Sequence, residues 1–172
     1  DRNRNRASAF DTDPRKKPIG TASRQATPNF GNSHDAGFDT RIKCTFIGGK
    51  MYSHKTTIRL HNTDAGGVLF FAEQLKLAHD AYESFMESAG FPFAALIKDS
   101  IYLLPIVHAE ADFLKPLAAG DRITVRMTAD RIGDTSFTLA YSLLRNGNEP
   151  VGTAKTVHVL IDKKSGEKRS LI

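Results

Sequence analysis

The chain has 172 residues, of which 40% are hydrophobic and 25% charged, a composition typical of one globular domain with a single core. It contains no run of about 18 apolar residues, so the sequence predicts no transmembrane helix. A single cysteine, Cys44, excludes an internal disulfide and a cysteine-based zinc site, and it is typical of a reducing, cytoplasmic location.

The first fifty residues differ in character from the rest. They carry ten Lys/Arg and five Asp/Glu, whereas residues 51–172 carry fourteen of each, so the whole net charge of +5 lies in residues 1–50. This segment is rich in Asn, Arg, Ser, Gly and Pro and lacks a periodic apolar face, which predicts disorder. Three interpretations stay open: an added or misassigned upstream segment, a natural disordered arm, and a basic tether for nucleic acid or lipid. With Met51 as a candidate native start, we expect the folded domain to span residues 51–172.

Two elements are predicted at the start of that domain. Alternation in residues 54–61 predicts a strand, and two stripes at helical spacing predict a helix that begins near residue 70 and ends at Gly90 and Pro92. The charged stripe is Glu73, Lys76, Asp80, Glu83 and Glu87, and the apolar stripe is Phe71, Leu75, Ala78, Tyr82, Phe85 and Met86.

Four further strands are predicted at residues 102–116, 122–132, 136–145 and 151–162. Short turns join them, among them an Asn-Gly hairpin signal, so we expect an antiparallel meander. The fold class is therefore α+β, with the helix on one face of the sheet. The first strand, which precedes the helix, is expected to join the sheet at a different place from the meander. An edge strand of such a sheet needs covering, and dimerisation through that edge would cover it.

The motif HNTDAGG joins the first strand to the helix. Asp64 could simply shape a turn by accepting backbone hydrogen bonds. However, Gly66 and Gly67 would let a ligand approach the backbone closely. The helix that begins near Phe70 or Phe71 has no capping side chain beside it, so its first N–H groups need a partner. A carboxylate beside an uncapped helix N-terminus is a minimal acyl-transfer site, because the N–H groups can stabilise an oxyanion.

This motif, followed by an aromatic pair and a helix, resembles the hotdog-fold acyl-CoA thioesterases of the 4-hydroxybenzoyl-CoA type. The resemblance covers nearly all of residues 51–172 and implies a long helix wrapped by a five-stranded antiparallel sheet. It also implies that Asp64 is the catalytic carboxylate, that the backbone N–H of Phe71 polarises the thioester carbonyl, and that Gly67 is the glycine of the turn. The usual motif is Asp-x-Asp-x-x-Gly, and here Asn62 replaces the first Asp.

Two other stretches, HDAYESFMESAG and LPIVHAEADFLKPLAAGDR, are similar to thioesterases that release 1,4-dihydroxy-2-naphthoate from its CoA ester in menaquinone and phylloquinone synthesis. By this resemblance His79 and His108 would line the acyl pocket, and Gly66 and Phe70 would contact the substrate. The basic cluster that holds the CoA phosphates in the 4-hydroxybenzoyl branch falls at residues 133–135, which read Gly-Asp-Thr here. The CoA contacts are therefore not carried over, and Lys115, Arg126 and Arg131 are candidates by position only.

Several alternatives follow from the same residues. A second hotdog branch places a catalytic Glu in the helix, where Glu83 is the nearest candidate and is expected to be a solvated surface residue. A short-chain or 4-hydroxybenzoyl-type thioesterase, a hotdog dehydratase and a non-catalytic acyl-CoA-binding module also stay open, although the module would not need Asp64.

The partners expected are an acyl-CoA substrate and further copies of the chain, as a dimer or tetramer with the active site at the subunit interface. We expect neither nucleic acid nor a membrane as partner. No cofactor is expected, and the scattered histidines without HxH or HExxH spacing predict no metal site. Whether Asp64 acts as nucleophile or as general base stays open.

Overall fold

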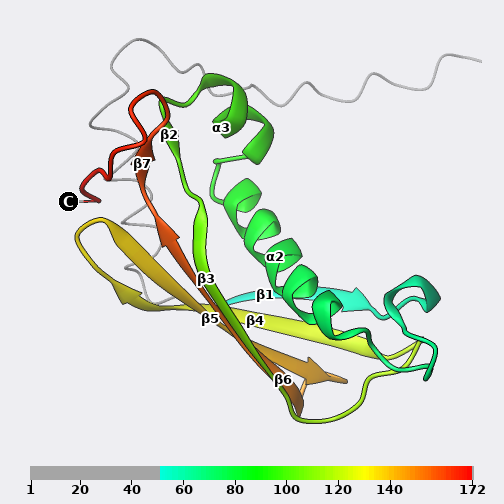
Figure 1. Ribbon diagram of the computed structural model, residues 1–172. Coiled ribbons are helices and arrows are strands. Elements are labelled where there is room, and N and C mark those ends of the chain that lie inside the picture. The colour runs from blue at the N-terminus through cyan, green and yellow to red at the C-terminus, as the bar shows by residue number, and fades with distance from the viewer. Residues whose placement is uncertain (1–50, 172) are drawn as a thin grey trace, which may run out of the picture.

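The computed structural model describes residues 51–171. The expectations for residues 1–50, including Cys44, lie outside the described residues. Figure 1 shows one long helix lying across a strongly bent sheet, with a short helix and a small strand pair at one end. Within the described range, no helix has both the length and the apolar composition needed to cross a membrane.

Five strands form one antiparallel sheet, which confirms the predicted α+β class and the five-stranded antiparallel sheet. Strands β4, β5 and β6 form a meander. The hairpin between β5 and β6 turns at Asn146 and Gly147, whose φ angles of 51° and 85° fit the predicted Asn-Gly turn. The strands, in the order that they take across the sheet, are β1 (Tyr52–Thr57), β4 (Arg122–Ile132), β5 (Ser136–Arg145), β6 (Glu149–Val159) and β3 (Ile106–Phe113).

The position of β3 corrects the expected meander of four strands. β3 pairs with β6, with Ala109 opposite Thr156, although β4 is the next strand in the chain. The connection over residues 114–121 leaves the β3 edge and contacts the loop before the long helix, where the N–H of Leu69 donates to the carbonyl of Leu117 at 2.7 Å. Strand β4 therefore begins beside β1, and β3 is left at the opposite edge of the sheet.

Two predicted strands are each divided. The strand predicted at 102–116 becomes β2 (Tyr102–Leu103) and β3, separated at Pro105, and the strand predicted at 151–162 becomes β6 and β7 (Ile161–Asp162). Proline lacks a backbone N–H and cannot continue a ladder on both sides. β2 and β7 pair with each other as a separate two-stranded sheet.

The first strand ends earlier than predicted. β1 stops at Thr57, and residues Leu60–Asn62 form a 3-10 helix, η1, in place of the end of the predicted strand. The side chain of Asn62 accepts a hydrogen bond from the N–H of Arg59 at 2.8 Å. Such local bonds from side chain to backbone compete with strand pairing.

Besides η1, the described residues form two α-helices. The long helix α2 (Phe71–Ser88) agrees with the predicted helix, and a short helix α3 (Phe93–Asp99) was not predicted. α3 has seven residues and no side-chain cap, so it carries almost no local sequence signal. Its N-cap is Pro92, which indicated only the end of the preceding helix.

The stripes of α2 are confirmed only in part. Glu73, expected among the solvated charges, is buried, and Phe71, expected on the apolar face, is 66% exposed. Leu77 and Ala81 are buried although neither belongs to the predicted apolar stripe. The reason is that α2 buries two adjacent residues in most turns, so its covered face is wider than a single stripe.

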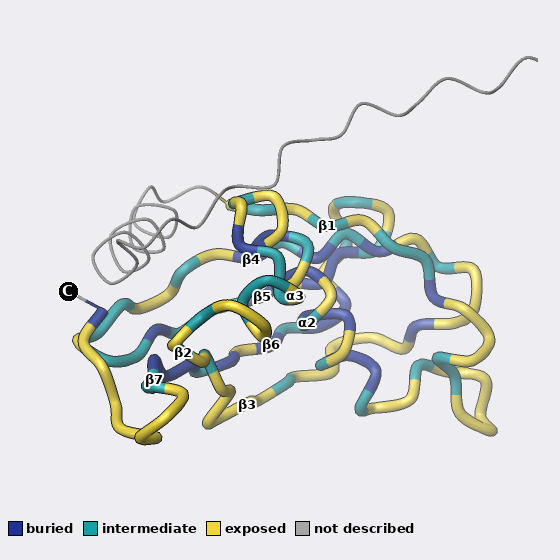
Figure 2. The backbone as a smooth tube through the Cα atoms, turned by 90° about the horizontal axis from the view of Figure 1, so that it is seen from above, coloured by how far each residue is buried: buried dark blue, intermediate teal, exposed yellow. Residues whose placement is uncertain are grey.

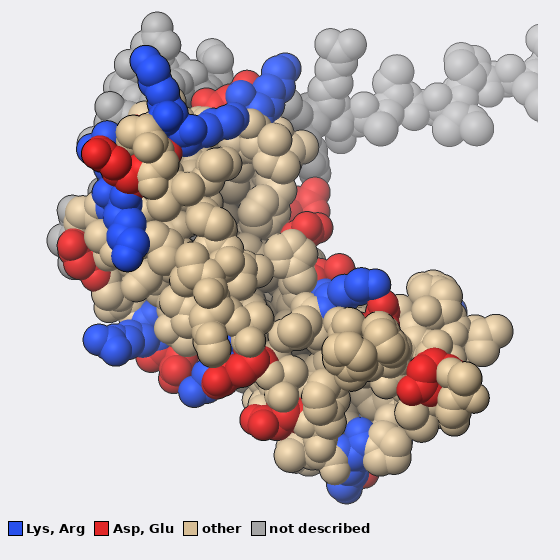
Figure 3. Space-filling model, viewed as in Figure 1, with Lys and Arg blue, Asp and Glu red and all other residues tan. Residues whose placement is uncertain are grey.

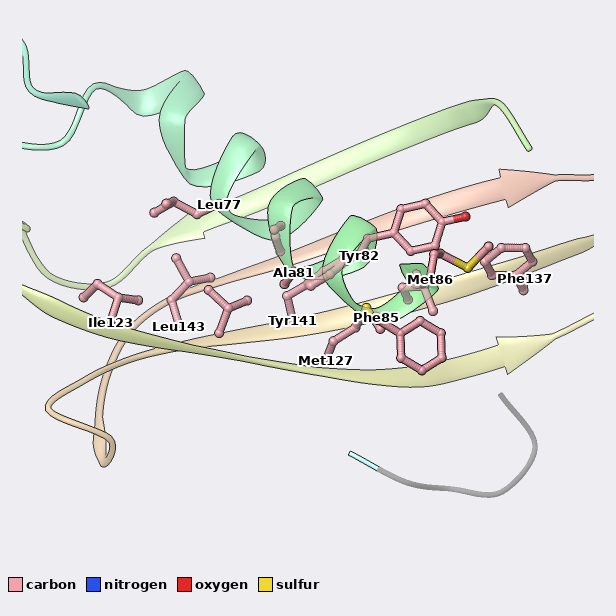
Figure 4. Packing of buried hydrophobic residues seen from close by; sticks show 14 of the residues in the cluster. Leu77, Ala81, Tyr82, Phe85, Met86, Ile123, Met127, Phe137, Tyr141 and Leu143 are labelled. Atoms are coloured by element: carbon pink, nitrogen blue, oxygen red, sulfur yellow. The ribbon is translucent and has the colours of Figure 1, made fainter. Parts of the chain in front are cut away.

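The core lies between α2 and one face of the sheet (Figure 4). α2 contacts β1, β3, β4 and β6. Figure 2 shows buried residues along β4, β5 and β6, whereas β3 is exposed over most of its length. The packed side chains labelled in Figure 4 are Leu77, Ala81, Tyr82, Phe85 and Met86 from α2, Ile123 and Met127 from β4, and Phe137, Tyr141 and Leu143 from β5.

Candidate active site

The HNTDAGG motif folds into a tight turn that enters α2. The N–H of Asp64 donates to the carbonyl of Val68 at 2.9 Å, and the N–H of Gly67 donates to the carbonyl of Asp64 at 3.0 Å. Thr63 and Leu69 form a bridge that closes the turn. Gly67 has a φ of 77°, in the left-handed region that favours glycine, so the turn needs this residue for its backbone conformation.

The Asp64 carboxylate uses one oxygen to shape this turn. Its Oδ1 accepts a hydrogen bond from the N–H of Gly66 at 2.8 Å. A Cβ at Gly66 would lie 3.1 Å from the same oxygen, so glycine allows this close approach. Oδ2 accepts no hydrogen bond from any residue between 51 and 171, and the side chain is exposed. The turn-shaping role and a chemical role are therefore compatible, since they use different oxygens.

The N-terminus of α2 is uncapped, as the sequence predicted. Its N-cap, Phe70, provides no side-chain hydrogen bond. The N–H of Phe70 donates to the carbonyl of Asn62 at 2.9 Å, and the N–H of Glu73 donates to the carbonyl of Phe70 at 2.9 Å. Among the described residues, none accepts a hydrogen bond from the N–H of Phe71. This donor is free for a ligand oxygen, and the helix dipole favours negative charge there.

Asp64, Phe70 and Phe71 line the same open hollow of about 430 Å³. Its opposite wall comes from residues 113–117, where β3 ends and the chain turns toward β4. Most of the wall is apolar, and Lys115 adds a cation whose Nζ donates to Glu149 at 2.8 Å. The structure thus brings the carboxylate and the free helix terminus to one cavity, of a size that holds small ligands.

His79 does not reach this hollow within one chain. It lies on α2 about two turns beyond Phe71, with its ring centroid 6.0 Å from that of Tyr82. Its Nε2 is 3.2 Å from a carboxylate oxygen of Glu83, which is exposed, as predicted for a solvated residue. His79 lines a second hollow of about 370 Å³ between α2 and the strands β3 and β6.

His108 lies outside both of these hollows. It is exposed on β3, opposite Val157 of β6, and its Nε2 is 3.4 Å from a carboxylate oxygen of Glu110. The neighbouring residue Ala109 lies opposite Thr156 and lines the second hollow, so His108 points to the other face of the sheet. Within one chain the structure therefore brings Asp64, Phe70 and Phe71 together but keeps both histidines apart from them.

Thr156 lines the second hollow and bonds to His158, and neither residue was predicted from the sequence. Thr156 is buried, and its Oγ1 lies 3.1 Å from the hydroxyl of Tyr141 and 2.8 Å from Nε2 of His158. Burial lowers the pKa of His158 to about 4, so this imidazole is neutral at physiological pH. On β6, Thr156 and His158 face the core and alternate with residues that face outward. The signal available in the sequence was a polar residue at a core position of the predicted strand.

The basic residues considered for CoA take different positions. Lys115 lines the hollow of Asp64, whereas Arg126 donates to the carbonyl of Gly147 at 3.1 Å and Arg131 lies further along β4. A third hollow of about 570 Å³ at the start of β4 is lined by Arg122 among others and has no carboxylate in its wall. On the face shown in Figure 3, both signs of charge are interspersed. Residues 51–171 contain no cluster of three or more His, Cys, Asp or Glu placed to hold a metal ion.

Comparison with known proteins gives a consistent family match. The family model described as the thioesterase-like superfamily matches residues 58–171. A 1,4-dihydroxy-2-naphthoyl-CoA hydrolase from Rippkaea orientalis is 39% identical over 123 residues, which cover 70% of this chain and 89% of the relative. A protein of the same name from Synechococcus elongatus is 35% identical over 121 residues, covering 70% of this chain and 88% of the relative.

Solved structures resemble the fold as well. A 1,4-dihydroxy-2-naphthoyl-CoA thioesterase from Synechocystis superposes with a TM-score of 0.67 at 29% identity, over 72% of this chain and 90% of that one. A gentisyl-coenzyme A thioesterase superposes with a TM-score of 0.62 at 24% identity, over 69% of this chain and 94% of that one, and this likeness concerns the fold alone.

Proposed function

Because this chain belongs to the thioesterase-like superfamily, we propose that it is a thioesterase that hydrolyses an aromatic acyl-CoA, 1,4-dihydroxy-2-naphthoyl-CoA, in menaquinone or phylloquinone synthesis. The substrate is supported by relatives of that name at 33% to 39% identity. The observation that carries the reaction is the single hollow that Asp64 and the uncapped start of α2 share.

The chemistry follows from the two groups in that hollow. A thioester carbonyl placed at the start of α2 receives a hydrogen bond from the N–H of Phe71, and the helix dipole stabilises the oxyanion that forms. Oδ2 of Asp64 either attacks the carbonyl carbon or takes a proton from the attacking water. Both routes consume one water molecule and release the carboxylic acid and the thiol of CoA. The proposed reaction uses no metal or cofactor.

The residues beside these groups suit the substrate-binding role expected for them. Gly67 provides the left-handed turn, and Gly66 keeps the backbone beside Asp64 free of a side chain. Phe70 is 42% exposed on the wall of the hollow, with its ring centroid 4.5 Å from that of Phe71. Such an exposed aromatic pair supports binding of an aromatic acyl group rather than a short aliphatic one.

The edge strand β3 supports assembly into a homo-oligomer, a dimer or a tetramer. Its side chains Ile106, Val107 and Phe113 are 41%, 59% and 56% exposed, and an apolar edge of this kind invites pairing with another chain. We place the active site at the interface. Because His79 and His108 lie on opposite faces of the sheet, a different copy of the chain would bring each of them to a hollow of Asp64. The sheet then wraps α2 as the hotdog fold requires, residues 51–172 form the catalytic domain, and its location is cytoplasmic.

The experiment for this proposal is thiol release from a panel of esters by the wild-type chain. The panel holds 1,4-dihydroxy-2-naphthoyl-CoA, 4-hydroxybenzoyl-CoA and a short aliphatic acyl-CoA. We expect the naphthoyl ester to have the highest kcat/KM. Preference for an aliphatic ester would support thioesterase activity but contradict the proposed naphthoyl substrate. Absence of thiol release from every ester would contradict the proposed enzymatic activity and favour a non-catalytic acyl-CoA-binding module.

A further inference from the structure

A partly buried side-chain pair connects the two ends of the segment that carries the candidate catalytic groups. Asn62 lies at the end of η1, and its Nδ2 donates to Oε2 of Glu73 at 2.8 Å. The side-chain oxygen of Asn62 accepts the N–H of Arg59 at 2.8 Å, and its backbone carbonyl accepts the N–H of Phe70 at 2.9 Å. Asn62 is thus bonded to the chain before the segment, to the N-cap of α2 and to the first turn of α2.

Glu73 is held firmly on the other side of this pair. Glu73 is 8% exposed, and its second carboxylate oxygen, Oε1, accepts a hydrogen bond from Lys76. Bonds from Lys76 and then Asn62 hold the pKa of Glu73 below its ordinary value, against the opposing effect of burial. A buried carboxylate needs such partners, because an unpaired charge is strongly unfavourable there. Glu73 also lies in the first turn of α2, where the helix dipole favours negative charge.

The placement of this pair gives it a consequence for catalysis. Asp64 follows Asn62 by two residues, and Phe71 precedes Glu73 by two residues. A bond between Asn62 and Glu73 therefore closes a loop around both groups and limits how far the carboxylate can move from the helix N-terminus. Misplacement of reacting groups by about 1 Å can lower a rate about 100-fold, so such a limit matters.

We propose that Asn62 and Glu73 are positioning residues that set the separation between the Asp64 carboxylate and the N–H of Phe71. The proposal rests on the proposed function, in which these two groups act on the thioester. It also explains why Asn62 stands where the family motif has Asp: beside Glu73 a donor is needed, and an aspartate would place two carboxylates face to face.

The test exchanges donor and acceptor across the pair. Asn62→Asp places a carboxylate against Glu73, and we expect kcat at pH 8 to fall about 30-fold with KM changed less than about threefold. Glu73→Gln keeps an acceptor for Asn62, and we expect a loss of only about threefold. In the double variant Asp at 62 accepts from Gln at 73, so we expect kcat to return to within about threefold of Glu73→Gln alone.

A pH profile separates this role from general stability. In Asn62→Asp, acidification protonates one of the two carboxylates and restores a hydrogen bond, so the kcat ratio of variant to wild type should rise from pH 8 to pH 5. The ratio for the double variant should stay flat, because no carboxylate pair is present. The charged neighbours are Lys76 and His61, which act on Glu73, and His79 and Asp80, which line the same hollow. All four are unchanged in every variant.

Control variants keep the outcomes distinct. Glu87→Gln removes the same charge from an exposed position on α2 and should leave kcat unchanged. Should Asn62→Asp fail to fold, Asn62→Ala removes the amide without adding charge and should lower kcat about tenfold. The proposal is overturned if the double variant is no more active than Asn62→Asp, or if Asn62→Ala retains wild-type kcat. A wild-type chain inactive on every ester would instead contradict the proposed function.

Discussion

Asp64 illustrates how one short side chain can combine a structural role with the chemical role proposed for it. Oδ1 accepts the N–H of Gly66, while Oδ2 has no partner among residues 51–171. The first bond restrains the direction of the carboxylate, and Asp64 lines the hollow at the start of α2. Preorganisation of this kind lowers the entropy lost when the group meets a substrate.

At this scale the sequence contained the proposed catalytic pair but not its surroundings. Asp64, Gly67 and Phe71 lie within eight residues of each other, so local rules on turns and helix caps could find them. Glu73 and Thr156 could not be found in that way. Their roles depend on partners brought together by the fold, such as Asn62 from η1 and His158 beneath the second hollow.

His158 leads to a prediction on pH and stability. Burial lowers its pKa from 6.5 to about 4 in the folded state, so between these values the unfolded chain binds a proton that the folded chain does not. The contribution of this neutral imidazole to the free energy of unfolding is fully present above about pH 6.5. It decreases by about 3 kcal/mol as the pH falls toward 4. Urea unfolding of wild type and His158→Gln from pH 4 to pH 7 should show a smaller decrease in the variant. Equal decreases in both would contradict a buried neutral imidazole.

At the scale of elements, Gln74 connects α2 to the sheet. Its side chain is buried, and its Nε2 donates to the carbonyls of Asp112 on β3 and Thr153 on β6, at 2.9 Å and 2.8 Å. Gly152 lies against this amide, and a Cβ there would be 2.6 Å from Oε1 of Gln74. The helix is therefore fixed to two neighbouring strands through a contact that only glycine permits.

Gly152→Ala should consequently destabilise the fold by about 1–3 kcal/mol, because the buried amide cannot move without losing both bonds. Urea unfolding measures the change. In a Gln74→Ala background the added methyl group meets empty space, so the double variant should lose clearly less than the sum of the two single variants. Additive losses would show that the methyl group and the amide do not interfere.

Some elements could be predicted from the local sequence pattern, and others could not. α2 could be predicted because its amphipathic period and Gly90 lie in one continuous segment. The pairing of β3 with β6 could not, because it depends on how residues 114–121 pass the loop before α2. A single proline likewise decided the division between β2 and β3, although the apolar pattern continues across it.

At the scale of the whole molecule, the exposed β3 edge leads to a prediction on assembly. Val107 is 59% exposed on this edge, and Val107→Glu would place a charge in the proposed contact. We expect a smaller mass by sedimentation and a loss of kcat/KM of about tenfold or more, since a partner copy is proposed to complete the site. Ile97→Glu, at a 64% exposed position on α3, should change neither quantity. Unchanged mass for Val107→Glu would contradict assembly through β3.

The most direct test of the account is the turnover of 1,4-dihydroxy-2-naphthoyl-CoA by wild type and by Asp64→Asn. Asparagine keeps the shape and can still accept the N–H of Gly66, so thermal unfolding and KM should stay close to wild type. We expect kcat to fall by about 1,000-fold, because the nucleophile or base is lost while the N–H of Phe71 remains. A kcat within about threefold of wild type would contradict it and leave Asp64 only its role in the turn.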